Sequence, residues 1–270
     1  MYIKAIIFDV DGTLADTENI HRQAFNAAFR EFDLDWEWSK EKYIRLLSIS
    51  GGRERIRDCL ESDPKMNGSI GCTRELAQRV HRRKTEIYKD MLNSDRITLR
   101  SGVVRLLNEA ISEGIRLAIA TSSSTSNVES LLENTLGRET TTLFDAIVTC
   151  DIVSNKKPSP AAYQLALAKL GLQPERCIAI EDTSNGNRAA LATGIKTIIT
   201  THEFTFDSDF TGASLVVDRL GEPDKPFTLS SGNAFGKQFV DLEFLDAVLT
   251  YDEVSQNIEC CEGNLAVAAK

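Results

Sequence analysis

The hydrophobic pattern of the chain opens with a short apolar run that ends in acid. Ile3 to Phe8 contains a single polar residue, and Asp9 and Asp11 follow it before Gly12. Such a run, with little polar alternation, is typical of a parallel strand that is covered on both faces. Side chains two positions apart leave a strand on the same side, so the two carboxylates face one point. The pattern therefore predicts a buried strand with two carboxylates at its tip.

The next part of the chain, residues 17–93, has the period of helices. Apolar residues recur there every three or four positions, and no strong strand pattern interrupts them. The two clearest stripes consist of Ile20, Ala24, Ala27, Ala28 and Phe32, and of Ala77, Val80, Ile87 and Met91. Ser50-Gly51-Gly52 breaks the helical pattern between these stripes. We therefore expect a helical insertion after the first strand.

Beyond Leu99 the pattern alternates between helix and strand. Three helical stretches end at a glycine and are each followed by an apolar strand, at Gly114, Gly171 and Gly194. This alternation predicts an α/β fold with a doubly wound, Rossmann-like parallel sheet. The strands predicted after the first one cover residues 115–120, 144–149, 177–180, 195–200 and 215–217.

These patterns divide the chain into three predicted parts. The α/β core is discontinuous and comprises residues 1–16 and 98–250, and the helical cap comprises residues 17–97. Residues 251–270 are expected to form a C-terminal tail. Within the core, residues 221–237 are rich in glycine, proline and serine, which indicates a long surface loop.

Composition narrows the class of protein. The chain has 270 residues, of which 42% are hydrophobic, enough for one substantial core and a smaller domain. Its formal net charge of −9 argues against nucleic acid or an anionic membrane as the main partner, because both select for basic surfaces. Six cysteines occur without a Cys-x-x-Cys pair, so neither a disulfide scaffold nor a zinc site is expected. With no apolar stretch of about 18 residues, we expect a soluble intracellular protein.

Polar residues cluster where the predicted strands end, which is where open α/β sheets bind ligands. These residues are Asp9, Asp11, Thr121, Ser122, Glu181, Asp182 and Asn185, with Lys157 in a loop between strands. Each one alone has an ordinary explanation as a helix cap, a surface lysine or a solvated acid. Together they predict a site for phosphate and a metal. Oxygen donors suit Mg²⁺ better than zinc, and the Asp-x-Asp-x-Asp-Gly pattern of a calcium loop is absent.

The spacing of these residues resembles a known family. Asp9-Val10-Asp11-Gly12-Thr13-Leu14, Thr121, Lys157-Pro158 and Glu181-Asp182 stand in the order of the four motifs of the haloacid dehalogenase-like hydrolases. The resemblance implies an aspartyl-phosphate formed on Asp9, an acid/base role for Asp11, and phosphoryl contacts from Thr121 and Lys157. It also implies that Mg²⁺ is held by Asp9, the backbone carbonyl of Asp11, Asp182 and Glu181.

The predicted cap resembles that of the β-phosphoglucomutase and phosphoglycolate phosphatase branch. Its segments 35–38, 51–56 and 84–86 are similar to the CbbY-like phosphatases, which act on xylulose 1,5-bisphosphate. The resemblance implies a Mg²⁺-dependent phosphatase that converts this substrate to xylulose 5-phosphate. The residues then expected to bind substrate are Glu18, His21, Gly51, Gly52, Arg53, Arg55, Lys84, Ser122 and Asn185.

Two other functions fit the same residues. A sugar phosphomutase of the β-phosphoglucomutase type would share Asp9, Asp11 and His21, and a catalytically silent sugar-phosphate binding protein would share the pocket. We expect a small sugar phosphate or bisphosphate as the partner, with no nucleic acid or membrane, and a monomer or weak oligomer. Residues 202–240 are similar to longer plant and algal members of this group. This resemblance implies a chloroplast location if the protein comes from a photosynthetic eukaryote. In any other organism we expect a cytoplasmic location.

Overall fold

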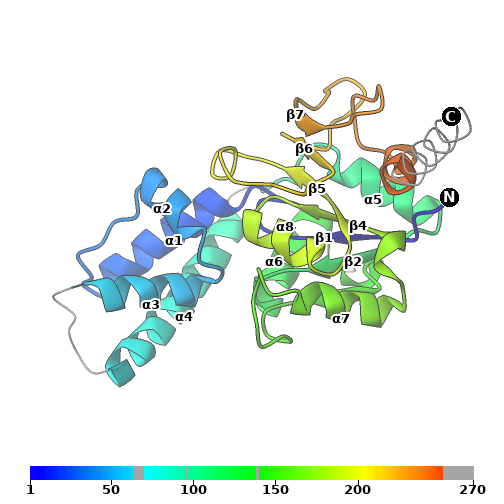
Figure 1. The fold of residues 1–270 in the computed structure, drawn as a ribbon. Coiled ribbons are helices and arrows are strands. Elements are labelled where there is room, and N and C mark those ends of the chain that lie inside the picture. Colours follow the sequence, from blue (N-terminus) through cyan, green and yellow to red (C-terminus); the bar gives the residue numbers. More distant parts are fainter. Residues whose placement is uncertain (64–69, 95–96, 138–139, 252–270) are drawn as a thin grey trace, which may run out of the picture.

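A computed structural model describes residues 1–63, 70–94, 97–137 and 140–251 (Figure 1). Its single sheet has the spatial order β3-β2-β1-β4-β5-β6-β7. The strands are β1 (Ala5–Phe8), β2 (Arg116–Ala120), β3 (Ala146–Val148), β4 (Cys177–Glu181), β5 (Lys196–Thr200), β6 (Leu215–Val217) and β7 (Leu229–Gly232). Neighbours from β3 to β6 pair in parallel, and β7 pairs antiparallel with β6. The predicted doubly wound parallel sheet is confirmed.

Helices occupy both the inserted segment and the connections between strands. They are α1 (Glu18–Glu31), α2 (Lys40–Leu46), α3 (Gly52–Ser62), α4 (Ile70–Ser94), α5 (Val103–Ser112), α6 (Thr125–Leu136), α7 (Ala161–Leu170) and α8 (Ser184–Leu191). Short 3₁₀ helices cover Thr140–Leu143 and Pro174–Arg176, and residues 242–251 are helical. As the pattern predicted, α7 ends at Gly171, whose left-handed conformation stops a helix.

The central strand β1 is buried on both faces, which explains its unbroken apolar run. Ile6 and Phe8 pack in one hydrophobic cluster with residues of α5 and α6. Ala5 and Ile7 face a second cluster that contains residues of α7 and α8. In the ladders, Phe8 pairs with residues in both β2 and β4, so the polar residues after these three strands emerge side by side.

Helices α1 to α4 lie together beyond the carboxyl edge of the sheet, on the left of Figure 1. We call residues 18–94 the cap, and the domain boundaries given above stay a prediction. An aromatic cluster fills its interior, where the ring centroids of Phe25 and Trp38 lie 4.6 Å apart and those of Phe29 and Trp38 lie 4.8 Å apart. The Asn26 side chain donates to the Trp38 carbonyl at 3.1 Å and accepts from its N–H at 2.8 Å. This pairing fixes the otherwise irregular link between α1 and α2.

Arg100 ties together the two chain segments that join the cap to the sheet. Its backbone N–H donates to the Leu14 carbonyl at 2.8 Å, and its guanidinium pairs with Asp16 at 3.1 Å. The same guanidinium donates to the carbonyl oxygens of Gly12, Thr200, Thr201 and Asp218. One side chain thus holds both connections against the ends of β5 and β6.

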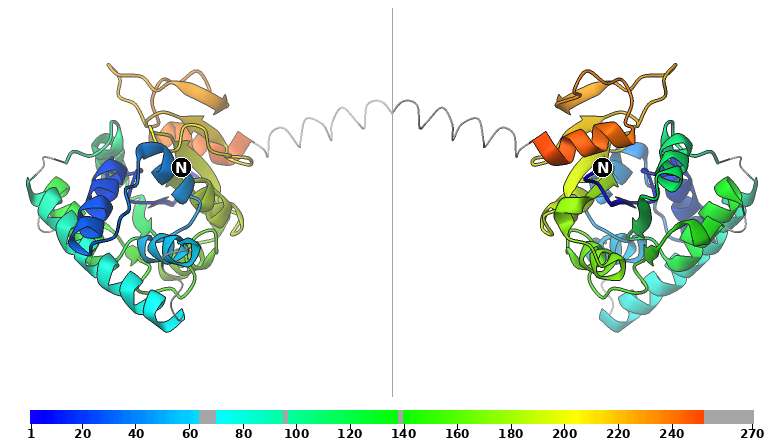
Figure 2. Two further views of the ribbon diagram at one scale, coloured as in Figure 1. Left: turned by 90° about the vertical axis from the view of Figure 1, so that its left-hand side faces the viewer. Right: turned by 90° about the vertical axis from the view of Figure 1, so that its right-hand side faces the viewer.

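One part of the sheet differs from the sequence-based expectation. Residues 221–237 were expected to form a surface loop, but they contain β7, which lies at the outer edge of the sheet (Figure 2). All four residues of β7 are exposed, so no apolar pattern marks the strand. The predicted tail lies outside the described residues except for Tyr251. Within the part of the chain that the structure describes, no helix is long and apolar enough to cross a membrane.

Candidate active site

Three carboxylates lie together at the carboxyl ends of β1 and β4. Asp9, Glu181 and Asp182 each place an oxygen within 4.8 Å of the other two, and all three residues are buried. The short, parallel pairing of β1 with β4 brings them together, although they are far apart in sequence. Such a cluster, built from oxygen donors alone, is the kind that Mg²⁺ prefers.

Lys157 lies among these carboxylates. Its Nζ donates to Asp9 Oδ1 at 2.5 Å and to Glu181 Oε1, which also accepts from the Tyr163 hydroxyl at 2.8 Å. Burial would lower the pKa of Lys157, but Asp9 and Glu181 outweigh it and raise that pKa above its usual value. One ammonium against three carboxylates leaves a negative charge that a divalent cation would balance. The residues present therefore fit a Mg²⁺ site.

Asp9 and Asp182 differ in the neighbouring groups that set their pKa values. Burial, followed by the charges of Glu181 and Asp182, raises the pKa of Asp9 well above its usual value against the opposing effect of Lys157. Burial also raises the pKa of Asp182, although His202 limits the rise through a contact of 2.9 Å to Oδ2. A bound cation would favour the ionised form of both groups.

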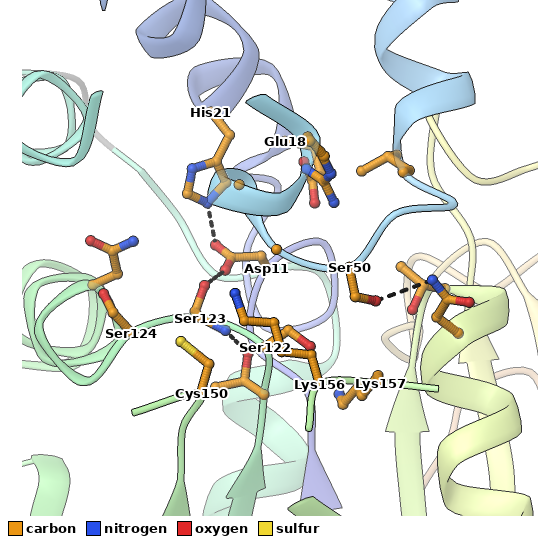
Figure 3. A pocket seen from close by; sticks show the side chains of 18 of the residues that line it. Asp11, Glu18, His21, Ser50, Ser122, Ser123, Ser124, Cys150, Lys156 and Lys157 are labelled. Carbon is orange, nitrogen blue, oxygen red and sulfur yellow. Dashed lines mark hydrogen bonds and ion pairs between the residues drawn. The ribbon is translucent and has the colours of Figure 1, made fainter. Parts of the chain in front are cut away.

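Asp11 has its own set of partners, most of them on the cap side. Oδ1 accepts from the Thr17 hydroxyl at 2.6 Å and lies 2.9 Å from His21 Nε2, while Oδ2 accepts from the Ser123 hydroxyl. Burial would raise the pKa of Asp11, but the charge and hydrogen bond of His21, with the two hydroxyls, hold it well below its usual range. Figure 3 shows His21 and Ser123 meeting Asp11 from opposite sides.

The segment after β2 lines the core side of the same cavity. Thr121 is buried, and its Oγ1 accepts from the Ser123 N–H at 3.1 Å. Ser122 Oγ is buried in the cavity wall and has no hydrogen-bond partner among the residues that the structure describes. An unpaired buried hydroxyl is costly, so this group is available to a ligand oxygen.

The cap supplies the opposite wall. The Tyr43 hydroxyl donates to Glu18 Oε2 at 2.7 Å and accepts from Arg55 Nη1 at 3.1 Å, so these three groups form one chain of hydrogen bonds. His21 Nδ1 lies beside Lys84 Nζ, and the Tyr88 ring stacks on His21 with centroids 4.0 Å apart. All the predicted cap residues except Arg53 line the cavity.

Burial controls the charge of two groups on α4. It lowers the pKa of Lys84 to about 7, against the raising effects of Asp11 and Glu18. It also lowers the pKa of His81 to about 3, helped by the charges of Lys84 and Lys156. His81 is therefore neutral at neutral pH, whereas Lys84 is poised between charged and neutral forms.

The Ser50-Gly51-Gly52 turn reaches down from the cap to the core. The Asn185 amide donates to the Ser48 carbonyl at 2.8 Å and to Ser50 Oγ at 3.1 Å. A dashed line in Figure 3 marks the bond to Ser50. The structure thus brings Asn185, Gly51 and Gly52 to the cavity, where Asn185 binds the cap.

Arg53 is the predicted substrate residue that the structure does not bring to the cavity. Its guanidinium pairs with Glu54 at 3.1 Å, and half of its side chain is exposed. It lines a separate groove with Arg57 and Arg74. Arg53 and Glu54 both line this groove, whereas Arg55, one position further along α3, lines the cavity.

Several residues of the site were not singled out from the sequence. They are Thr17, Tyr43, His81, Tyr88, Tyr163 and His202. His81 precedes Lys84 by three positions, a spacing that places both on one side of a helix and could have revealed it. His202 carried no such signal, because it reaches Asp182 only through the pairing of β4 with β5.

The parallel sheet and the buried cluster of carboxylates and lysine at its carboxyl edge define an α/β enzyme with a hydrolase site. A family model described as haloacid dehalogenase-like hydrolase matches residues 6–200. The chain is 44% identical over 226 residues to the plasmid protein CbbY of Cupriavidus necator, covering 83% of this chain and 88% of that one. It is 36% identical to a CBBY-like protein of Arabidopsis thaliana, covering 87% of this chain and 76% of the relative.

A solved structure gives the same result. The crystal structure of a CbbY variant from Rhodobacter sphaeroides, in complex with xylulose 1,5-bisphosphate, is similar with a TM-score of 0.74 and 42% identity. The similarity covers 80% of this chain and 94% of that chain. The protein belongs to the haloacid dehalogenase-like hydrolases and to their CbbY-like group, and it is a phosphatase.

Proposed function

We propose that this phosphatase is Mg²⁺-dependent and removes one phosphate from a small sugar bisphosphate, xylulose 1,5-bisphosphate, to give xylulose 5-phosphate. The observation that carries the proposal is a cavity with two different walls. Its core wall holds Asp9 and Lys157 side by side, and its cap wall holds Arg55 and Lys84. One wall can perform phosphoryl transfer while the other binds a second anionic group.

Asp9 is the proposed nucleophile. Its carboxylate must approach a phosphate dianion, and each pair of unit charges about 4 Å apart repels by roughly 4 kcal/mol at an effective dielectric near 20. Lys157 already donates to Asp9 and would hold a phosphoryl oxygen as charge moves in the transition state. Thr121 and Ser122 would hold others. Mg²⁺, held by Asp9, Asp182 and the Asp11 carbonyl with Glu181 in support, would supply the remaining charge neutralisation.

Asp11 is the proposed acid and base. When the bond from phosphorus to the sugar oxygen breaks and the bond to Asp9 forms, Asp11 gives its proton to the leaving oxygen. It then takes a proton from the water that attacks the phosphorus and releases Asp9. The depressed pKa of Asp11 favours the second role, and an entering phosphate dianion raises that pKa toward the first. His21 and Thr17 keep the carboxylate aimed into the cavity.

Substrate choice is assigned to the cap, because the core contacts only the transferred phosphoryl group. Arg55 offers a planar guanidinium for a second phosphate, and Lys84 offers an ammonium. Glu18, held in place by the Tyr43 hydroxyl, would accept hydrogen bonds from sugar hydroxyls. The xylulose 1,5-bisphosphate named for the Rhodobacter structure supports this substrate class. A plastid location and a monomeric or weakly oligomeric state stay predictions.

The test is phosphate release with and without Mg²⁺ from four substrates: xylulose 1,5-bisphosphate, ribulose 1,5-bisphosphate, phosphoglycolate and β-glucose 1-phosphate. We expect the highest kcat/KM for xylulose 1,5-bisphosphate and loss of turnover after chelation. Isomerisation of β-glucose 1-phosphate without net phosphate release would identify a phosphomutase instead. Binding of these compounds without turnover would identify a silent sugar-phosphate binding protein.

A further inference from the structure

An ion pair joins the cap directly to the core at the edge of the cavity. Lys156 Nζ, in the loop before α7, donates to Glu54 Oε2 on α3 at 2.7 Å. The side chains of Lys156 and Glu54 are only 20% and 23% exposed, so the pair is largely shielded from water. Because such shielding strengthens an ion pair, this one contributes more to the cap–core contact than an exposed pair would.

The turn that precedes α3 is shaped around this pair. Gly51 has a φ of +99°, a conformation that favours glycine, and a side chain there would collide with both Glu54 Oε2 and Lys156 Nζ. The backbone of the turn therefore lies directly against the two charged groups. A second crossing, from Asn185 to Ser48 and Ser50, holds the other side of the same turn.

The pair also determines which charges face the cavity. Burial would raise the pKa of Glu54, but the hydrogen bond and charge of Lys156 lower it, so Glu54 remains an anion at neutral pH. Lys156 is thereby neutralised by a cap residue, whereas its neighbour Lys157 is neutralised by core carboxylates. Adjacent lysines thus have partners on opposite sides of the cavity.

We propose that Glu54 and Lys156 are positioning residues that hold the cap onto the core and set the Ser50-Gly51-Gly52 turn over the bound substrate. Through this contact they favour substrates that extend into the cap. The proposal rests on the proposed function only in its choice of a sugar phosphate as the extended substrate. Neither residue is assigned a contact with the reacting phosphoryl group.

The test compares a sugar bisphosphate with p-nitrophenyl phosphate, a substrate that offers the cap no second anionic group. We expect Glu54→Gln and Lys156→Met each to lower kcat/KM for xylulose 1,5-bisphosphate by roughly tenfold more than for p-nitrophenyl phosphate. The double variant should lose no more than either single variant, because both remove the same contact. Exchanging the charges, with Glu54→Lys and Lys156→Glu together, should recover part of the loss.

Glu61→Gln is the matched control, because Glu61 pairs with Arg57 at 3.4 Å within α3 and does not reach the core. It should leave the ratio of the two substrates unchanged. Equal losses for both substrates in Lys156→Met would overturn the proposal and assign Lys156 to the phosphoryl group. Additive losses in the double variant would overturn it as well.

Small-angle X-ray scattering provides a readout that does not depend on the substrate. Glu54→Gln should increase the radius of gyration relative to the wild type, and the charge exchange should reverse the increase. An unchanged radius of gyration in Glu54→Gln contradicts the proposal even if no sugar phosphate is turned over. Failure of the proposed function and failure of this inference are therefore distinguishable.

Discussion

The two walls of the cavity are built on different principles. On the core wall, Asp9, Glu181 and Asp182 are fixed by adjacent parallel strands, and Lys157 binds two of them. On the cap wall, the polar groups come from separate helices and bind mainly one another, as Tyr43 does with its two cap partners. The core wall is thus a rigid centre for one reaction. The cap wall is a set of replaceable contacts that can change the substrate without changing the chemistry.

The largest effect should come from breaking the core wall at its nucleophile. Asp9→Asn keeps the shape of the side chain but removes its charge, so turnover should fall by at least about 10⁴-fold. Phosphate release from xylulose 1,5-bisphosphate measures the loss. Asp207→Asn, at an exposed position, is the control and should keep full activity. Substantial turnover by Asp9→Asn would place the nucleophile elsewhere.

Removing Lys157 should show how much its positive charge stabilises the buried carboxylates of the core wall. Lys157→Met leaves buried carboxylates without their cation, so the free energy of unfolding should fall by about 3 kcal/mol. A carboxyl group whose pKa is raised on folding makes the folded protein less stable as pH rises. The difference in unfolding free energy between Lys157→Met and the wild type should therefore grow with pH. Mg²⁺ should restore part of it.

Urea unfolding with and without Mg²⁺ measures this change in stability, and Lys169→Met, at an exposed position of α7, is the control. An unfolding free energy equal to that of the wild type in both conditions would contradict the charge balance described for this cluster.

Substitutions of Arg55 and Arg53 should show that the first lies on the cap wall of the cavity and the second on the outer surface of the cap. Arg55→Gln removes a guanidinium that lines the cavity, so KM for xylulose 1,5-bisphosphate should rise roughly tenfold. Arg53→Gln removes only an exposed pair with Glu54, so KM should change by less than about twofold. Steady-state kinetics decide the matter, and a larger effect from Arg53→Gln would reverse the assignment of the two side chains.

The most gradual effect concerns Lys84, whose pKa is lowered to about 7 by burial. Between that value and the ordinary lysine pKa, the unfolded chain binds one more proton than the folded protein. Stability should therefore rise with pH across this window, by up to about 1.4 kcal/mol per unit. Urea unfolding over this range should show the slope in the wild type and its absence in Lys84→Met. Equal slopes in the two proteins would show that Lys84 keeps an ordinary pKa.

Much of the fold could be predicted because, along the core, the hydrophobic periodicity and the positions of glycine residues indicate the same elements. The apolar run before Asp9 indicated a strand buried on both faces, and a glycine after α5, α7 and α8 marked where the next strand begins. The strand at 229–232 escaped prediction because its exposed, polar residues have no pattern, and its pairing with β6 supplies the order. Local sequence carries no record of such a partner.

The site residues of the core and of the cap also differ in how well the sequence predicts them. The core residues could be predicted because parallel strands deliver their carboxyl ends to one edge, so position in sequence translates directly into position in space. On the cap, orientation depends on where each helix begins and how it rotates. Arg53 and Arg55 could not be distinguished from spacing alone, and no sequence signal pairs Lys156 with Glu54. Those choices are made by tertiary packing, around Gly51 in particular.

The position of Arg100 has a consequence for how far the cap can move. Because it binds both connecting segments, at Leu14 and Asp16 as well as through its own chain, the cap is attached by a two-stranded hinge and not by a single tether. Two connections held side by side restrict the directions in which the cap can move more than one connection would. The effective concentration of cap groups at the core surface is then high, and contacts of ordinary strength suffice to close it.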